Sequence, residues 1–155
     1  MSSLKVLIFA PVDETGESEE KLKNAGCELV LGEASWHNPQ GDNEDQMHRM
    51  AQGAVALKGT SIRSSPISRK IIESSPDLRI IAKYTIGVDD VDVAAATENG
   101  VLVTHSPTES NWGGVAEGTM TMMLSALKKT RERDQAMKQG LWRDSNLQGT
   151  YLGRR

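Results

Sequence analysis

The chain has 155 residues, enough for one compact α/β domain with an appendage but short for two complete domains. It contains no run of about 20 apolar residues, which argues against a membrane protein, and its short apolar start turns acidic at Asp13, as expected for the first core strand of a cytoplasmic protein. A formal net charge of −3 with mixed signs offers no broad basic surface, so nucleic acid is not an expected partner.

Five strand-length apolar runs alternate with segments of helical period. In chain order, each run and the helical segment after it are 4–11 and 18–26, 27–33 and 43–53, 54–59 and 67–75, 78–85 and 91–100, and finally 101–107. This alternation with short connections predicts an α/β fold, a doubly wound parallel sheet of five strands with helices on both faces. Gly26, Gly53 and Gly100 each stand between a helix and the next strand, where a helix C-terminal glycine is expected.

The pattern changes after residue 107. One long helix is predicted from about Asn111 to Gly140, followed by a tail without another strand. We therefore predict a first domain over 1–107 and a second unit, helix and tail, over 108–155. A helix of about 30 residues exceeds the usual globular length of roughly 8 to 20, so it is expected to leave the first domain and pack on something else.

The stretch KYTIGVDDVDV, residues 83–93, lies at the carboxyl end of the fourth predicted strand, where ligands gather in open α/β sheets. Compact residues over 85–87 let the main chain approach a ligand, and successive N–H groups there can form a cup for a carboxylate or phosphate. An ordinary strand-to-helix turn is the alternative. Asp89, Asp90 and Asp92 admit a metal site or a direct chemical role, but capping and complementing the next helix is favoured.

Two blocks of this region match a known pattern. The first pattern is a basic residue followed by x-G-x-G-x-D-N-[IV]-D, and the second is N-x-P followed by N-x-x-x-V-A-E. The matching residues are Lys83, Gly87, Asp89 and Asp92 in the first block and Asn111, Val115, Ala116 and Glu117 in the second. The chain thus resembles the D-isomer-specific 2-hydroxyacid dehydrogenases, the family of phosphoglycerate, glycerate and formate dehydrogenases. It departs from the pattern at Thr85, which replaces the first glycine, at Asp90, which replaces asparagine, and at His105, where asparagine is common.

The resemblance implies a flavodoxin-like first domain and hydride transfer between a nicotinamide and a 2-hydroxy or 2-oxo acid. It implies that the main chain of Thr85–Gly87 binds the substrate carboxylate and that Asn111 also touches substrate. Ile86, Val115 and Thr119 would lie near the cofactor. From the residues alone, Asn111 can instead be a helix N-cap, and Val115 and Thr119 can be core residues.

The family's catalytic arginine, carboxylate and histidine and its phosphate loop have no counterpart in this sequence. None of the 14 glycines is separated from another by one residue, so there is no G-x-G-x-x-G, and no histidine follows the long helix. We therefore assign no catalytic residue and no metal site. We expect a truncated substrate domain plus the first helix of the cofactor domain, inactive alone, with NAD or NADP bound only by the full-length enzyme. His105 is expected to be solvated or bonded to the main chain.

The long helix carries more apolar residues than one narrow stripe requires: Val115, Met120, Met122, Met123, Leu124, Ala126 and Leu127. We expect a homodimer through the 111–140 helix, as the resemblance also implies. Trp112 and Trp142 bracket this helix and either anchor the interface or pack at the helix ends.

Two other classes of function share features of this sequence. A phosphoacceptor receiver domain shares the alternation of five strands with helices, but it needs an aspartate after the third strand and a lysine after the fifth. This chain has Gly59-Thr60 and His105-Ser106 at those places. A non-catalytic protein that binds small acids or dimerises is the other alternative.

Overall fold

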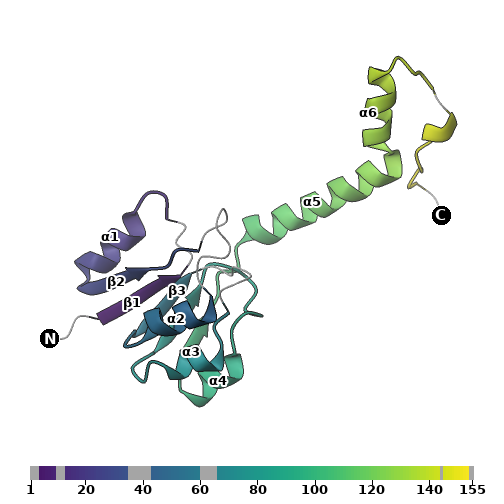
Figure 1. Cartoon of the computed structure of the whole chain (residues 1–155). Helices are drawn as coiled ribbons and strands as arrows, with labels where there is room; N and C mark the ends of the chain where they lie inside the picture. The colour runs from purple at the N-terminus through teal and green to yellow at the C-terminus, as the bar shows by residue number, and fades with distance from the viewer. Residues whose placement is uncertain (1–3, 10–12, 35–42, 60–65, 144, 154–155) are drawn as a thin grey trace. The chain divides into compact units, whose positions relative to one another are not determined.

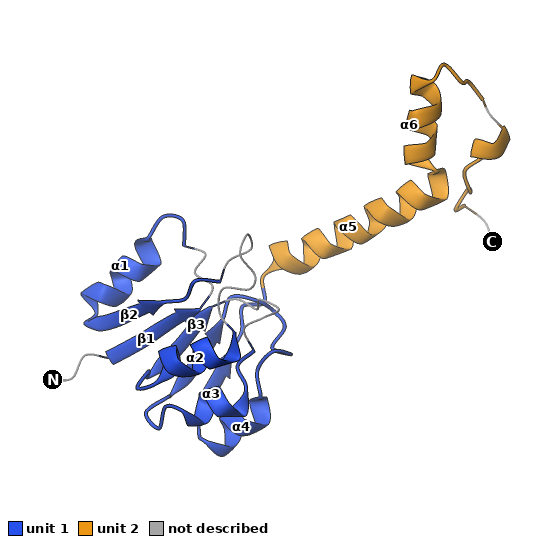
Figure 2. Ribbon diagram, in the orientation of Figure 1, with its two compact units in different colours: residues 1–107 blue, residues 108–155 orange. Residues whose placement is uncertain are grey.

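The structure is a computed structural model that describes residues 4–9, 13–34, 43–59, 66–143 and 145–153. The chain folds into two compact units, residues 1–107 and residues 108–155 (Figure 2). The first unit contains the sheet and the second is helical. In the described part of the chain, no helix combines the length and the apolarity needed to cross a bilayer.

The first unit is an α/β fold. Its elements are β1 (Leu4–Phe9), α1 (Glu17–Asn24), β2 (Cys27–Leu31), α2 (Glu44–Ala51), β3 (Ala56–Gly59), α3 (Arg69–Glu73), β4 (Ile80–Lys83), α4 (Val93–Glu98) and β5 (Leu102–Thr104). The described strands all pair in parallel and their order across the sheet is β2-β1-β3-β4-β5. Figure 1 labels β2, β1 and β3, which lie side by side in that order. The predicted five-stranded parallel sheet is confirmed, and this order is the flavodoxin-like one.

The helices form two layers. α2 packs beside α3 and α3 beside α4, whereas α1 packs along β2 (Figure 1). Right-handed crossovers put α1 on the opposite face, because the chain moves from β1 to β2 in one direction and from β2 to β3 in the other. The apolar core includes residues of all three central strands, Leu7, Leu57 and Ile81, each fully buried and clustered with residues of the α2–α4 layer.

Glycines end three of the helices of this unit. Gly26, Gly53 and Gly100 have φ angles of 87°, 71° and 66°, a left-handed conformation that is unfavourable for a residue with a Cβ atom. The predicted helix C-terminal role of the three glycines is confirmed.

Asp13 organises the start of α1. Its Oδ1 accepts hydrogen bonds from the N–H and the hydroxyl of Thr15 and from the Gly16 N–H, and its Oδ2 accepts one from the Ser18 N–H at 2.7 Å. These donors, the Thr15 hydroxyl foremost, lower the pKa of Asp13 to about 2. The side chain therefore stays ionised and holds the turn that leads from β1 into α1.

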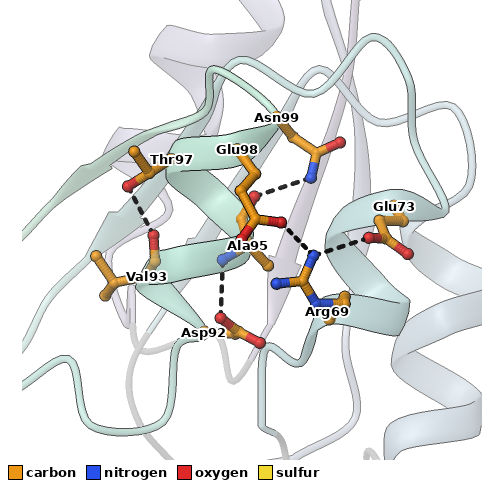
Figure 3. A network of polar contacts seen from close by, with 8 residues as sticks. All are labelled: Arg69, Glu73, Asp92, Val93, Ala95, Thr97, Glu98 and Asn99. Carbon is orange, nitrogen blue, oxygen red and sulfur yellow. Dashed lines mark hydrogen bonds and ion pairs between the residues drawn. The ribbon is translucent and has the colours of Figure 1, made fainter.

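A polar network joins α3 to α4 (Figure 3). Asp92 caps α4, since its Oδ1 accepts a hydrogen bond from the Ala95 N–H at 2.8 Å. Arg69 Nη1 donates to Glu98 Oε2 at 2.6 Å and to Glu73 Oε1 at 3.2 Å. The guanidinium of Arg69 lowers the pKa of the Glu98 carboxyl. The helix-capping prediction is thus confirmed for Asp92. The exposed ion pair of Arg69 with Glu98 links the two helices only weakly, and that of Arg69 with Glu73 lies within α3.

The second unit corrects the predicted long helix. It consists of α5 (Glu109–Lys128), α6 (Thr130–Lys138) and a short 3-10 helix (Ser145–Leu147). The single helix expected over 111–140 is wrong, because Lys129 adopts a left-handed conformation (φ 52°, ψ 45°) and separates α5 from α6. The Lys129 N–H donates a hydrogen bond to the Ala126 carbonyl at 3.2 Å, which ends α5.

The tail folds back on the corner between α5 and α6. The Thr150 N–H donates to the Leu127 carbonyl at 2.8 Å, and Lys128 Nζ donates to the Thr150 carbonyl at 2.5 Å. Lys129 Nζ donates to the Asn146 carbonyl at 2.7 Å. The break in the helix is therefore held by residues that come after α6 in the sequence.

α5 contains no buried residue. Its exposed large apolar side chains are Trp112, Val115, Met120, Met122, Met123 and Leu124, with exposed fractions between 41% and 68%. Asn111 lies inside the first turn and Thr108 stands at the N-cap, so the N-cap alternative for Asn111 is wrong. Val115 and Thr119 are both exposed, so neither packs in a core as the alternative for them required.

Candidate functional site

The segment after β4 leaves the sheet at its carboxyl edge. The Tyr84 N–H donates to the Gly59 carbonyl at 2.9 Å, which extends the pairing of β3 and β4 by one residue. The chain then bends through residues 84–86 before it reaches α4. In this loop Ile86 is half-buried and Gly87 is exposed. A ligand can therefore approach the main chain of the loop at the edge where open α/β sheets bind ligands.

Three consecutive carbonyls of the loop accept hydrogen bonds from the protein. The Ser106 N–H donates to the Thr85 carbonyl at 3.0 Å, and the Thr85 hydroxyl donates to the Gly87 carbonyl at 2.9 Å. His105 Nδ1 lies 3.0 Å from the Ile86 carbonyl oxygen. Because a carbonyl can only accept, this Nδ1 must carry a proton. His105 is thus exposed and bonded to the main chain, as the sequence predicts.

These contacts determine where the loop N–H groups point. In a trans peptide the C=O and the following N–H point in opposite directions, and the described residues include no cis peptide. In a strand, successive carbonyls alternate in direction. Here the consecutive carbonyls of Thr85 and Ile86 both meet residues 105–106, so the N–H groups of Ile86 and Gly87 lie together on the other side. Adjacent N–H groups on one side form an anion-binding concavity.

The paired donors are available for a ligand. Among the described residues, none accepts a hydrogen bond from the N–H of Ile86, Gly87 or Val88. A Cβ placed on Gly87 would meet one described atom within 4 Å, Asp89 Oδ2 at 3.1 Å. Where a side chain at 87 would stand, the described residues thus place only the end of the Asp89 side chain.

An ion pair joins the two ends of the loop. Lys83, the last residue of β4, pairs with Asp90, and the Lys83 side chain is fully buried while that of Asp90 is 18% exposed. The Lys83 ammonium also lies 5.5 Å from the centre of the Phe9 ring. Burial lowers the pKa of Lys83, and the hydrogen bond and attraction from Asp90 oppose that change.

Sequence reasoning missed this pair. Asp90 was expected to complement the start of α4, but its carboxylate binds Lys83 instead. The available signal was a lysine within an apolar strand. Side chains alternate between the two faces of a strand, so Lys83 lies on the same buried face as Ile81, while Ala82 between them points to the other face. A buried lysine requires a partner nearby, and Asp90 is the acidic residue that the loop brings back to it.

The site residues taken from the resemblance fall in two groups. Thr85, Ile86 and Gly87 share the loop after β4 in the first unit. Asn111, Val115 and Thr119 stand four residues apart along one row of α5 in the second unit, and the Thr119 hydroxyl donates to the Val115 carbonyl at 2.8 Å. The structure therefore brings the members of each group together.

The residues present do not make a complete dinucleotide site. Pyrophosphate binding in this class of folds uses a G-x-G-x-x-G turn, and the 155 residues contain none. The side chains of Ile86 and Val115 can offer a nicotinamide only apolar contact, and the Thr119 hydroxyl already donates its proton to the Val115 carbonyl within α5. No chemical step can be assigned to a cofactor on these residues alone.

The strand order and the open loop at the carboxyl edge define a flavodoxin-like α/β unit with a candidate site for a small anion. The model of the family described as D-isomer specific 2-hydroxyacid dehydrogenase, catalytic domain, matches residues 6–139. The chain belongs to this family, and the resemblance seen in its sequence is confirmed.

Individual relatives agree with this assignment. The chain is 26% identical over 149 residues to the D-3-phosphoglycerate dehydrogenase of Archaeoglobus fulgidus, an alignment that covers 96% of this chain and 26% of the relative. A glyoxylate reductase from Paecilomyes thermophila shares the fold with a TM-score of 0.76 at 22% identity, over 97% of this chain and 46% of that one. The NAD-dependent formate dehydrogenase from Staphylococcus aureus, in complex with NAD, shares it with a TM-score of 0.71 at 22% identity, over 93% and 44%. The chain thus spans about a quarter of that curated relative and less than half of either solved structure.

Proposed function

We propose that this chain is the substrate-domain portion of an NAD(P)-dependent D-2-hydroxyacid dehydrogenase, and that its loop Thr85–Gly87 binds the carboxylate of a 2-hydroxy or 2-oxo acid. The observation that carries the proposal is the pair of N–H groups of Ile86 and Gly87 on one side of the loop, without an acceptor among the described residues. Membership of the family supports the class of acid.

The proposed role of these groups is orientation. Two N–H groups can each donate to a carboxylate oxygen, and hydrogen bonds to an ionised acceptor are roughly twice as strong as neutral ones. They would fix the carboxylate and with it the position of the neighbouring C2 atom. In the family a nicotinamide exchanges the hydride with C2. We propose no proton carrier within this chain.

The second unit is proposed to begin the cofactor domain. Asn111 would contact substrate, and Val115 and Thr119 would lie near the nicotinamide together with Ile86; the row formed on α5 supports this assignment. By itself the chain is proposed to bind NAD(H) weakly at most and to be inactive. Saturable binding of NADH in the micromolar range, measured by calorimetry, would contradict this part of the proposal.

The loop amides offer a direct test of acid binding. When ¹⁵N-labelled chain is titrated with pyruvate or D-lactate, the amide resonances of Ile86 and Gly87 are expected to shift most and to saturate. In the Gly87→Ala variant a methyl group occupies the approach to the paired donors, and we expect at least about a ten-fold loss of affinity, the effect of one lost hydrogen bond to a charged group. Because the new Cβ meets only the flexible end of Asp89 among the described residues, the fold should remain intact.

Gly118→Ala is the matched control. It makes the same substitution in α5, where an added Cβ meets nothing within 4 Å. The control should keep the affinity of the wild type. Resonance changes that avoid the 85–88 loop, or equal affinity in Gly87→Ala and wild type, would rule out carboxylate binding at this loop.

We also propose that the chain forms a homodimer through α5. A 20-residue helix without a buried residue exposes a continuous apolar surface that water solvates poorly. The exposed methionines Met120, Met122 and Met123 support this proposal, because thioether side chains adapt to an imperfectly matched surface. The same helix would serve the alternative of a non-catalytic dimerisation protein, which the acid titration distinguishes.

The dimer is tested by one charge on each side of α5. Met123→Glu puts a carboxylate on the apolar side and is expected to shift the chain to monomers in sedimentation analysis. Thr121→Glu is the control, because two residues correspond to about 200° around the helix axis and place the charge on the other side. A wild type that sediments as a monomer at every concentration, or an equal effect of both variants, would refute an interface on this side.

A further inference from the structure

We propose that His105 and Thr85 are positioning residues, whose side chains hold the carbonyls of Ile86 and Gly87 so that the N–H of Gly87, one of the two donors of the proposed carboxylate site, stays on the ligand side. This inference rests on the proposed carboxylate site and names what keeps that site in its binding form. The two contacts are His105 Nδ1 to the Ile86 carbonyl at 3.0 Å and the Thr85 hydroxyl to the Gly87 carbonyl at 2.9 Å.

The peptide between Ile86 and Gly87 needs such a restraint. Glycine tolerates a wide range of backbone angles, so a peptide beside it can rotate about its own axis without moving the chain on either side. A half-turn of this peptide would replace the Gly87 N–H by the Ile86 carbonyl on the ligand side. A carbonyl oxygen there would repel a carboxylate, and the hydrogen bond from His105 opposes that rotation.

The two paired donors are held in different ways. The peptide that carries the Ile86 N–H is fixed by the main chain, because the Ser106 N–H donates to the Thr85 carbonyl. The peptide that carries the Gly87 N–H is held by a side chain, His105. Removing the imidazole should therefore leave the first donor in place and release the second. The Thr85 hydroxyl holds the next peptide, because it donates to the Gly87 carbonyl.

Both side chains stand where this sequence departs from its family pattern, Thr85 in place of glycine and His105 in place of asparagine. Two departures that contact successive carbonyls of one short loop act on the same structural feature. We infer that this chain holds the binding form of its loop with two side-chain donors: His105 stands where the family asparagine could donate in the same way, and Thr85 adds a donor where the family glycine has none.

The contact made by His105 predicts its tautomer, and this test needs no ligand. The neutral ring must carry its proton on Nδ1, since the Ile86 carbonyl can only accept. Two-bond ¹⁵N–¹H spectra of the imidazole are expected to show a protonated Nδ1 and an unprotonated Nε2 in the neutral ring. A proton on Nε2 alone would overturn the role of His105.

Variants test the role in binding. His105→Ala is expected to weaken pyruvate binding about five- to ten-fold, the effect of releasing one of the two donors. Because His105 is exposed, the urea concentration at the midpoint of unfolding should change little. His105→Asn is the rescue, because its amide nitrogen reaches the place of Nδ1, and it should retain affinity within about two-fold. The second pair is Thr85→Val, which removes the hydroxyl at nearly constant shape, and Thr85→Ser, which keeps it.

The outcomes separate the two proposals. If the wild type binds pyruvate and His105→Ala and Thr85→Val bind it equally well, the positioning role is wrong while the carboxylate site stands. If the wild type shows no binding, the carboxylate site fails, and the positioning role for binding fails with it. Loss of affinity in His105→Ala that His105→Asn restores supports the inference.

Discussion

Replacing Asp90 with alanine is expected to lower the free energy of unfolding by about 3 kcal/mol, at the low end of the range for breaking a buried ion pair. The physical reason is the burial of its partner. Lys83 has a fully buried side chain, and removing the carboxylate of Asp90 removes the opposite charge that offsets part of the cost of burying its ammonium. Urea unfolding monitored by circular dichroism measures the difference.

Two further variants separate charge from contact. Asp90→Asn keeps an oxygen acceptor near Lys83 and should lose roughly half as much stability as Asp90→Ala, because the ammonium can still donate a hydrogen bond to the neutral amide oxygen. The double variant Lys83→Met with Asp90→Asn removes both charges and is expected to recover most of the loss. A double variant that is as unstable as Asp90→Ala would show that the ion pair is not the source of the effect.

The same pair gives a dependence on pH. Burial lowers the pKa of Lys83 from its usual 10.5, and Asp90 opposes this, so without Asp90 the pKa falls further. Between the lowered pKa and 10.5 the unfolded chain binds more protons than the native chain, and the free energy of unfolding therefore rises with pH. The stability that Asp90→Ala loses relative to the wild type should therefore become smaller as the pH is raised from neutrality toward 10.5. A loss that stays constant over this range would show that the Lys83–Asp90 pair is not its source.

Gly59→Ala is expected to lower the free energy of unfolding by about 3 kcal/mol, because overpacking is severe where backbone cannot move. A Cβ at this position would lie 2.0 Å from the Phe9 carbonyl oxygen and 2.6 Å from the nearest atom of its ring. Phe9 is the partner of Gly59 in the pairing of β1 with β3, so the clash falls where these two inner strands end and are paired backbone to backbone. Thermal or urea unfolding of the variant measures the loss.

The control for this prediction is again Gly118→Ala. Its new methyl group has open space within 4 Å, and alanine favours a helix interior over glycine by roughly 0.5 to 1 kcal/mol. The control should therefore unfold at the same or a higher urea concentration than the wild type. A Gly59→Ala chain as stable as the wild type would mean that β1 and β3 separate easily at this point.

The fold of the first unit was readable from local patterns. Strands buried in a parallel sheet have continuous apolar runs, and the run 4–11 contains the observed strand β1. The cap of α4 was readable as well, because a capping aspartate acts on an N–H only three residues further along, here Asp92 on Ala95. Gly100 marked the end of the same helix for an equally local reason.

The break between α5 and α6 was not readable. The sequence around Lys129 contains neither glycine nor proline and keeps helical character throughout, so the period alone indicated one helix. Lys129 itself contacts Asn146, and its neighbour Lys128 contacts Thr150; both partners lie beyond α6. A pattern read over a few neighbouring residues contains no information about such contacts.

The sequence by itself determined the order of strands and helices, the local caps and the loop over 85–87 that the family pattern marks for an acid. The tertiary structure alone decided the direction of the N–H groups of Ile86 and Gly87, because the donors that hold the loop carbonyls include residues 105–106 of the next strand segment. It also decided that Asp90 binds Lys83 instead of complementing α4. The physical reason is common to both: hydrogen bonds and ion pairs depend on which segments the folded sheet brings within about 3 Å, and local sequence does not fix that proximity.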